Sequence, residues 1–279
     1  MAESAESNAP ANARTIREAI DNVLENGSVA ALVTIVQSDQ LMVGSKLLVL
    51  AGARTIGDLG DAPLNRMVAA ATAKFLQTHA EASMSPIGDL APQLNSLAST
   101  LLLFERIEGE PHLVVAGAGH VGASLARLAA TVGYRVTLID DRAEFVGREL
   151  FNSPREQQIN LITASNWAEA VRDSSGSGHG VSIAIVTRGH KQDEDCLRAA
   201  LAANPDYIGM IGSKRRTNIV LQKLGAEGFA GEQLQKVRAP IGLDIGAISP
   251  EEVALAILAE IVAERRGGAG GSLSHWRRE

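Results

Sequence analysis

The stretch "HLVVAGAGHVGASLARLAATVGYRVTLIDDR", residues 112–142, decides the fold. It runs from a short apolar segment through the glycine-rich run GAGHVG into an Ala- and Leu-rich helical pattern, and ends in a second apolar segment. Gly117 permits a tight turn, Gly119 lets a phosphate approach the backbone, and Gly122 lets the helix pack closely on the strand. A helix that begins there offers free N–H groups and a partial positive charge to an anion. The stretch therefore predicts a nucleotide-binding strand–loop–helix unit.

The chain around this stretch alternates between apolar segments and helical patterns, which predicts an α/β protein. Residues 110–266 are expected to form a Rossmann-like, doubly wound parallel sheet. A smaller N-terminal α/β domain is expected over residues 14–107, with a loop at 81–96. The expected parallel strands are 113–116, 135–139, 159–162, 181–186 and 207–211.

The two ends of the chain are polar or rich in glycine, and such sequence cannot offset its ordering entropy. We expect residues 1–13 to be a disordered tail and residues 267–279 to be a flexible one.

Composition narrows the function classes. The net charge of −6 disfavours general attraction to nucleic acid, and no apolar run reaches the length of a membrane span. The N-terminus also lacks the layout of a secretory signal, so we expect a cytoplasmic protein without a nucleic-acid or membrane partner.

Cys196 is the single cysteine, which excludes an intrachain disulfide and any site built from several cysteines. It shares a helical face with Leu197, Ala200 and Leu201, which favours a buried core thiol. The sequence has no P-loop, no Gly-x-Ser-x-Gly elbow and no His-Glu-x-x-His. We therefore assign no catalytic residue and no metal ligand.

A carboxylate follows the glycine loop at the spacing that suits recognition of ribose hydroxyls, at Asp140. Arg142 could instead accept a 2′-phosphate, so NAD and NADP both remain open, as does a scaffold without a ligand. His120 lies inside the loop, where its ring either faces the ligand or caps local backbone.

Ligands of such sheets bind beyond the carboxyl ends of the strands, so the loops after later strands also matter. After the fourth strand, Thr187 and His190 are candidates for ligand contact or proton handling. The alternative is a structural role, because Asp193 and Glu194 suit the dipole of a helix that starts there.

The fifth strand is followed by "GSKRR", with Gly212 and Ser213 before a helix. Lys214, Arg215 and Arg216 then lie in its first turn, where positive charge opposes the helix dipole. A bound anion would resolve this conflict, and a solvated cluster is the alternative. Asp244 lies in a later turn shaped by glycines, and we weigh a functional role there equally with turn chemistry.

Three separated segments, "VVAGAGHVGASLARLAATVGYRVTLIDDR", "IGMIGSKRR" and "APIGLDIGAISPEEVALAILAEIVAERR", together resemble the XdhC/CoxI family of xanthine dehydrogenase accessory proteins. The resemblance covers residues 104–266. The N-terminal part departs from the family, whose members often carry a Gly-Gly-x-Cys-Val-Glu-like stretch, because "TIGDLGDAPLN" stands there without a cysteine.

The resemblance implies a cofactor chaperone rather than a turnover enzyme. Such proteins bind the molybdenum cofactor, assist its sulfuration with a cysteine desulfurase and deliver it to an apo-enzyme, a molybdenum hydroxylase; they are commonly homodimers. A pterin phosphate or a nucleotide is then expected to bind at the glycine loop, residues 117–122, and at the cations of residues 214–216. An NAD(P)-dependent oxidoreductase and a non-catalytic nucleotide-binding module are the alternatives.

Overall fold

The computed structural model describes residues 9–78, 80–176 and 178–274, without the side chains of residues 9–12 and 51. The chain divides into two compact units, and the boundary falls between Gly109 and Glu110.

The C-terminal unit is built on a five-stranded parallel sheet in the order β10-β9-β6-β7-β8. The first strand of this unit, β6, lies in the centre of the sheet, and β7 and β8 follow on one side of it. The chain then returns to the other side of β6, where it forms β9 and β10. This order confirms the predicted doubly wound sheet and puts the topological switch point between β6 and β9. The strands are β6 His112–Ala116, β7 Arg135–Asp140, β8 Asn160–Thr163, β9 Val181–Ile185 and β10 Tyr207–Met210.

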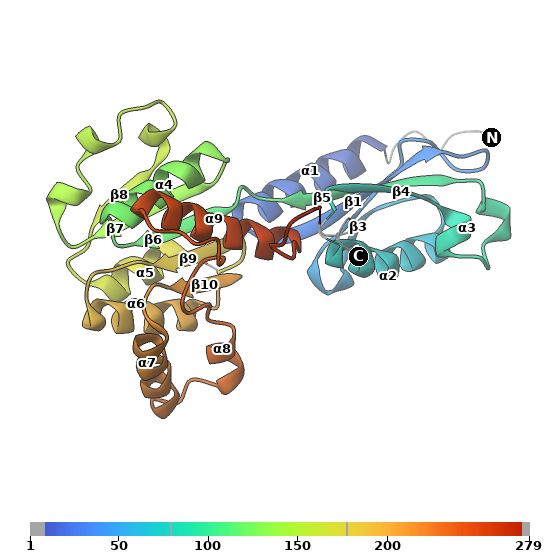
Figure 1. The fold of residues 1–279 in the computed structure, drawn as a ribbon. Helices are drawn as coiled ribbons and strands as arrows, with labels where there is room; N and C mark the ends of the chain where they lie inside the picture. The colour runs from blue at the N-terminus through green and yellow to red at the C-terminus, as the bar shows by residue number, and fades with distance from the viewer. Residues whose placement is uncertain (1–8, 79, 177, 275–279) are drawn as a thin grey trace. The chain divides into compact units, whose positions relative to one another are not determined.

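Helices cover both faces of this sheet (Figure 1). α4 (His120–Thr131) and α9 (Pro250–Arg266) pack on one face, and α5 (Trp167–Ser175) and α6 (His190–Ala203) pack on the other. Alternate residues of β6 enter the two cores, which explains why this strand is apolar throughout and buried along its whole length.

Two further helices follow β10, namely α7 (Lys214–Ala226) and α8 (Gly231–Gln235). Arg238 then pairs with Gly209 in parallel and extends the sheet by one bridge. A capping box marks the start of α9: the Ser249 hydroxyl accepts from the Glu252 N–H at 3.2 Å, and the Glu252 carboxylate accepts from the Ser249 N–H at 2.9 Å.

The N-terminal unit contains a five-stranded antiparallel sheet in the order β3-β2-β1-β5-β4. Figure 1 shows α1 (Ala9–Glu25) on one face and α2 (Ala62–Gln77) on the other. Leu32 on β1 therefore joins the core under α1, and its neighbour Val33 joins the core under α2. The strands are β1 Val29–Gln37, β2 Lys46–Val49, β3 Thr55–Asp58, β4 Ala82–Pro86 and β5 Leu101–Glu108.

Residues 81–96 do not form the loop that their sequence predicts. They contain β4 and the short helix α3 (Ile87–Leu90), because β4 pairs with β5 along its whole length. At the N-terminus α1 already begins at Ala9, so residues 9–13 of the expected disordered tail are helical. The remainder of that tail, residues 1–8, and residues 275–279 lie outside the described residues.

Short 3₁₀ turns occupy several connections. They lie at Ala51–Ala53, Asn95–Leu97, Ala143–Phe145, Arg148–Leu150 and Glu156–Gln158. Among the described residues, no helix is both long enough and apolar enough to span a bilayer.

Candidate functional site

The candidate site lies at the switch point, where the loops after β6, β7 and β9 meet. Backbone hydrogen bonds tie these loops to the central strand: the Gly117 N–H donates to Ile139 at 2.8 Å, and the Val186 N–H donates to Ala116 at 2.8 Å. Because β7 and β9 flank β6, their loops line the two sides of the glycine loop.

Two glycines of the loop are required by close packing. Gly117 has a φ of 114°, and a Cβ there would lie 2.6 Å from the carbonyl oxygen of Val186. A Cβ on Gly122 would lie 1.8 Å from the carbonyl oxygen of Gly117. These two positions therefore fix the tight turn and the approach of α4 to β6, as the sequence pattern predicts.

Gly119 differs from the other two, because a Cβ added there would meet no atom within 4 Å. It is the N-cap residue of α4, and no side chain accepts a hydrogen bond from the first turn of that helix. The N-terminus of α6, after Gly189, also lacks a side-chain cap. The first N–H groups of both helices thus lack a side-chain cap, and those of α4 begin beside open space, where an anion could bind.

The Asp140 carboxylate accepts four hydrogen bonds from within the protein. Its Oδ2 accepts from the Ala118 N–H at 2.8 Å and from Arg142 Nη2 at 3.0 Å; its Oδ1 accepts from the Arg142 N–H at 3.0 Å and from Arg142 Nε at 2.8 Å. Burial opposes ionisation of this carboxyl, but the hydrogen bonds from Arg142 and Ala118 outweigh it and lower the pKa of Asp140. Asp140 thus holds the glycine loop.

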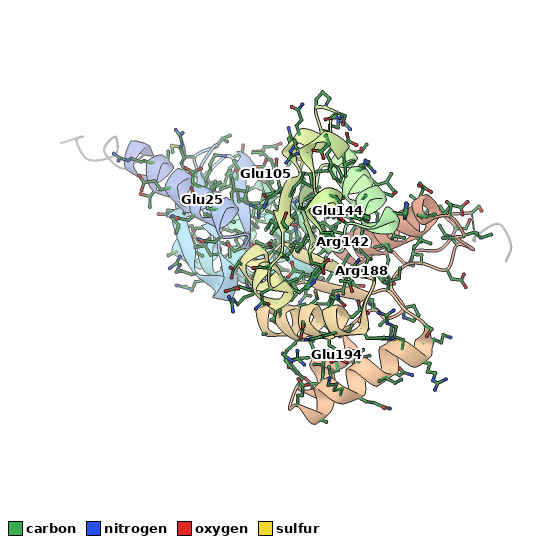
Figure 2. The ribbon with its side chains drawn as sticks, turned by 90° about the vertical axis from the view of Figure 1, so that its left-hand side faces the viewer. Glu25, Glu105, Arg142, Glu144, Arg188 and Glu194 are labelled. Atoms are coloured by element: carbon green, nitrogen blue, oxygen red, sulfur yellow. The ribbon has the colours of Figure 1, made fainter. Side chains whose placement is uncertain are left out.

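Arg142 lies between Asp140 and an aromatic ring. Its guanidinium carbon lies 3.6 Å from the centroid of the Phe145 ring. Its Nε also lies 3.7 Å from Asp141 Oδ1, and on the other side of that carboxylate Arg188 Nη2 lies 3.5 Å from Oδ2. Figure 2 shows Arg142 and Arg188 near each other, from the loops after β7 and β9.

A buried polar cluster links the loop after β9 to α6 and α7. Asp193 is fully buried; it accepts from the Thr187 hydroxyl at 2.5 Å and from the guanidinium of Arg216. Burial raises the pKa of Asp193, and the contacts with Thr187 and Arg216 offset this only in part. Arg216 Nε is buried without a hydrogen-bond partner in the described part of the chain. Asp193 therefore links α6 to α7 and to the loop after β9, whereas its sequence position suggests only a favourable interaction with the dipole of its own helix.

The start of α7 keeps two cations in solvent. The Ser213 hydroxyl accepts from the Arg216 N–H at 3.3 Å and caps the helix, after Gly212 has ended the β10 segment. Lys214 and Arg215 are exposed, and neither forms an ion pair with any described residue. Their charges oppose the helix dipole without an internal counter-charge.

The other predicted site residues are exposed. His120 and His190 each begin a helix, α4 and α6, and neither ring makes a hydrogen bond to a described residue. Asp244 is exposed in its turn, and no described contact joins it to the loops at the switch point. Cys196 is fully buried, as predicted, and burial raises the pKa of its thiol.

The sequence does not single out Asp141 and Arg188 as site residues, although each directly follows a residue placed at the end of a parallel strand. Arg216 is expected to join Lys214 and Arg215 in binding an anion, but its guanidinium is instead paired with the buried Asp193. No sequence signal pairs Arg216 with Asp193, because that contact depends on how α6 and α7 pack. Within the described residues, no group of three or more His, Cys, Asp or Glu side chains could hold a metal ion.

Part of this chain is similar to a protein named as a xanthine dehydrogenase subunit and to one named as a molybdenum cofactor insertion chaperone. A protein of Bacillus subtilis (strain 168), named as a probable subunit of xanthine dehydrogenase, is 29% identical over 188 residues, which are 65% of this chain and 53% of that protein. The molybdenum cofactor insertion chaperone PaoD of Escherichia coli (strain K12) is 28% identical over 153 residues, 55% of this chain and 40% of that protein. The chain thus spans about half, or less, of the length of these curated relatives.

A solved structure supports the fold independently. The crystal structure of a xanthine dehydrogenase from Bacillus halodurans superposes with a TM-score of 0.64 at 18% identity, covering 91% of this chain and 67% of that one. Residues 113–261, which include the glycine loop and the strand ends described above, match the XdhC Rossmann domain. Because this match covers more than half of the 279 residues, the chain belongs to the XdhC family.

Proposed function

We propose that this protein is a maturation factor that binds the molybdenum cofactor and assists its sulfuration and its insertion into a molybdenum hydroxylase. The hydroxylase would be of the xanthine dehydrogenase or carbon monoxide dehydrogenase type. The observation that carries the proposal is membership of the XdhC family, in which one relative is named a molybdenum cofactor insertion chaperone.

The switch point supports binding of a phosphorylated cargo. The open space at Gly119 and the uncapped start of α4 suit a phosphate group of a pterin or of a nucleotide. Lys214 and Arg215, which lack a counter-charge among the described residues, supply further attraction for an anion. Thr187, His190 and His120 are proposed as contacts at the same edge of the sheet, and Asp244 as a more distant one.

The chain's own thiol is unsuited to carrying sulfur. Cys196 is the single cysteine; it lies in the core between β9 and α6, where burial keeps it protonated and shielded. We therefore propose that the protein holds the cofactor while a separate cysteine desulfurase supplies the sulfur atom.

The remaining partners follow from this role. The recipient would be the apo-form of the hydroxylase, and the chaperone would act as a cytoplasmic homodimer. Transfer of the cofactor between the two proteins requires binding and release, and it requires no turnover chemistry from the chaperone.

The cargo can be tested by its pterin. The protein is expressed in a host that makes the molybdenum cofactor, purified without oxygen and then oxidised, and the fluorescent pterin is measured per protein. We expect pterin in the wild type and a loss of most of it in Gly119→Val, whose side chain would fill the open space at the loop. Gly231→Val is the matched control, because a Cβ there also meets no atom within 4 Å.

Delivery is tested separately, by adding the loaded protein to an apo-hydroxylase and measuring the recovered activity. Absence of pterin from the wild type, combined with no binding of added cofactor, would refute the proposal. Pterin binding without any gain in hydroxylase activity would instead indicate a binding module that delivers nothing.

A further inference from the structure

One ion pair crosses the candidate site. Arg188 follows β9, Asp141 follows β7, and their side chains meet with Arg188 Nη2 at 3.5 Å from Asp141 Oδ2. Because β6 lies between β7 and β9, this pair spans the carboxyl end of β6, where the glycine loop begins. A ligand held by the glycine loop therefore lies within reach of both side chains.

Asp140, the carboxylate that the sequence pattern assigns to a ribose, has no free acceptor position. A carboxylate offers about four lone-pair positions. In Asp140 two are filled on each oxygen: Oδ1 by the N–H and Nε of Arg142, and Oδ2 by the Ala118 N–H and Arg142 Nη2. Hydroxyl groups could bind there only by breaking a bond that holds the glycine loop.

Asp141 has the free positions that Asp140 lacks. Its carboxylate is partly exposed and accepts no hydrogen bond from the described residues. Its two cationic neighbours, Arg142 Nε at 3.7 Å and Arg188 Nη2 at 3.5 Å, lie at ion-pair distances rather than in good hydrogen-bond geometry. Both of its oxygens can therefore accept from a pair of hydroxyls.

The surrounding charge favours hydroxyls over a phosphate at this point. The negative charges of Asp140, Asp141 and Glu144 raise the pKa of Arg142, and Arg142 and Arg188 are the two cations of this group. Figure 2 shows Arg142, Glu144 and Arg188 near one another. Arg142 is already bound through two nitrogens to Asp140 and stacked on Phe145. Arg142 is therefore not free for another anion. Arg188 is already paired with Asp141, so a second phosphate beside Asp141 would meet the like charge of the carboxylates.

We infer that Asp141, one residue beyond the position that the motif predicts, recognises a ribose diol, and that the ligand of this site carries a nucleotide with unsubstituted 2′- and 3′-hydroxyls. This inference rests on the proposed function only in placing the ligand at the glycine loop. It narrows the cargo to a nucleotide-bearing form and excludes a ribose that carries a 2′-phosphate.

The experiment measures binding of NAD⁺ and of NADP⁺ to the full chain by calorimetry, because these probes differ only in the 2′-phosphate. We expect NAD⁺ to bind at least about tenfold more tightly than NADP⁺. In Asp141→Asn, which keeps the shape and removes the charge, NAD⁺ should bind about tenfold more weakly, and the preference over NADP⁺ should shrink. Glu232→Gln, an exposed carboxylate on α8, is the matched control and should bind as the wild type does.

Equal affinity for the two probes, tighter binding of NADP⁺, or no binding of either to the wild type would overturn the inference. So would unchanged NAD⁺ affinity in Asp141→Asn. The comparison in the wild type does not depend on the folding of any variant. Pterin recovery is measured in parallel: pterin without discrimination between the probes refutes this inference alone, and discrimination without pterin refutes the proposed cargo alone.

Discussion

His112 begins β6 with its imidazole buried between neighbouring side chains. Its Nε2 lies 2.9 Å from the Thr137 hydroxyl, and its Nδ1 lies 3.3 Å from Arg135 Nη2. Burial, reinforced by the charge of Arg135, lowers the pKa of His112 from 6.5 to about 4. The folded protein therefore keeps this ring neutral at a pH at which the unfolded chain takes up a proton.

This shift predicts a pH-dependent stability. Because the folded pKa lies below the unfolded one, the contribution of His112 is complete above pH 6.5 and is lost as the pH falls through about 4. Urea unfolding should show that the wild type loses about 2 kcal/mol more than His112→Gln between pH 7 and pH 4.5. His179→Gln, at an exposed histidine, should follow the wild type. Parallel pH profiles for wild type and His112→Gln would contradict the assignment.

Substitutions at two glycines of the loop should affect different properties, one the stability of the protein and the other its binding of an anion. In Gly122→Ala the new Cβ would collide with the Gly117 carbonyl, so the free energy of unfolding should fall by roughly 1–3 kcal/mol. Gly119→Val should leave stability nearly unchanged and abolish anion binding, because its side chain enters open space. Urea unfolding together with titration of pyrophosphate separates the two effects. Retained pyrophosphate affinity in Gly119→Val would show that the loop does not hold the anion.

At the scale of elements, the two cations at the start of α7 should lower the stability of the protein and strengthen its binding of anions. Lys214 and Arg215 lie in the first turn of this helix, where cations are unfavourable to the helix dipole. Replacing both by Glu should raise the free energy of unfolding by about 0.3–1 kcal/mol per site and weaken pyrophosphate binding. The control Lys74→Glu with Lys236→Glu reverses two exposed charges elsewhere and should not change pyrophosphate affinity. A double variant that is more stable and binds unchanged would identify the two cations as solvated surface charge.

The helices and strands that could be predicted from the sequence are those whose formation depends on the pattern of their own side chains. The strands β6 and β9 are mainly apolar and buried along their whole length, and Ser249 with Glu252 marks the start of α9. By contrast, β4 reads Ala-Ser-Met-Ser-Pro and is largely exposed. It forms because the backbone of β5 offers hydrogen bonds at the sheet edge, and a local pattern does not report that.

Only part of the candidate site could be predicted from the sequence. The position of the glycine loop follows from sequence, because its glycines are required by contacts within one strand–loop–helix unit. Which carboxylate stays free does not follow, since Asp140 and Asp141 are adjacent and differ only in the partners that the folded loops bring to them. The pairing of Asp193 with Arg216 likewise joins two helices that are separated in sequence by β10.

At the scale of the whole molecule, the two units have separate cores. The buried clusters of the N-terminal unit draw on residues up to Ile107, and those of the C-terminal unit begin at Leu113. The candidate ligand site is formed by residues of the C-terminal unit. A ligand that binds only the folded form stabilises the part of the chain that it contacts.

We therefore expect NAD⁺ to protect the two units unequally. In hydrogen exchange with saturating NAD⁺, backbone amides of 110–266 should exchange more slowly, above all at the start of α4 and in the loops after β7 and β9, while those of 14–107 should stay unchanged. The protection should disappear in Gly119→Val and persist in Gly231→Val. At [L] equal to about 100 times Kd, the stabilisation should reach about 2.7 kcal/mol in the C-terminal unit. Equal protection of the sheet around β1 would show that ligand binding and the N-terminal fold are energetically coupled.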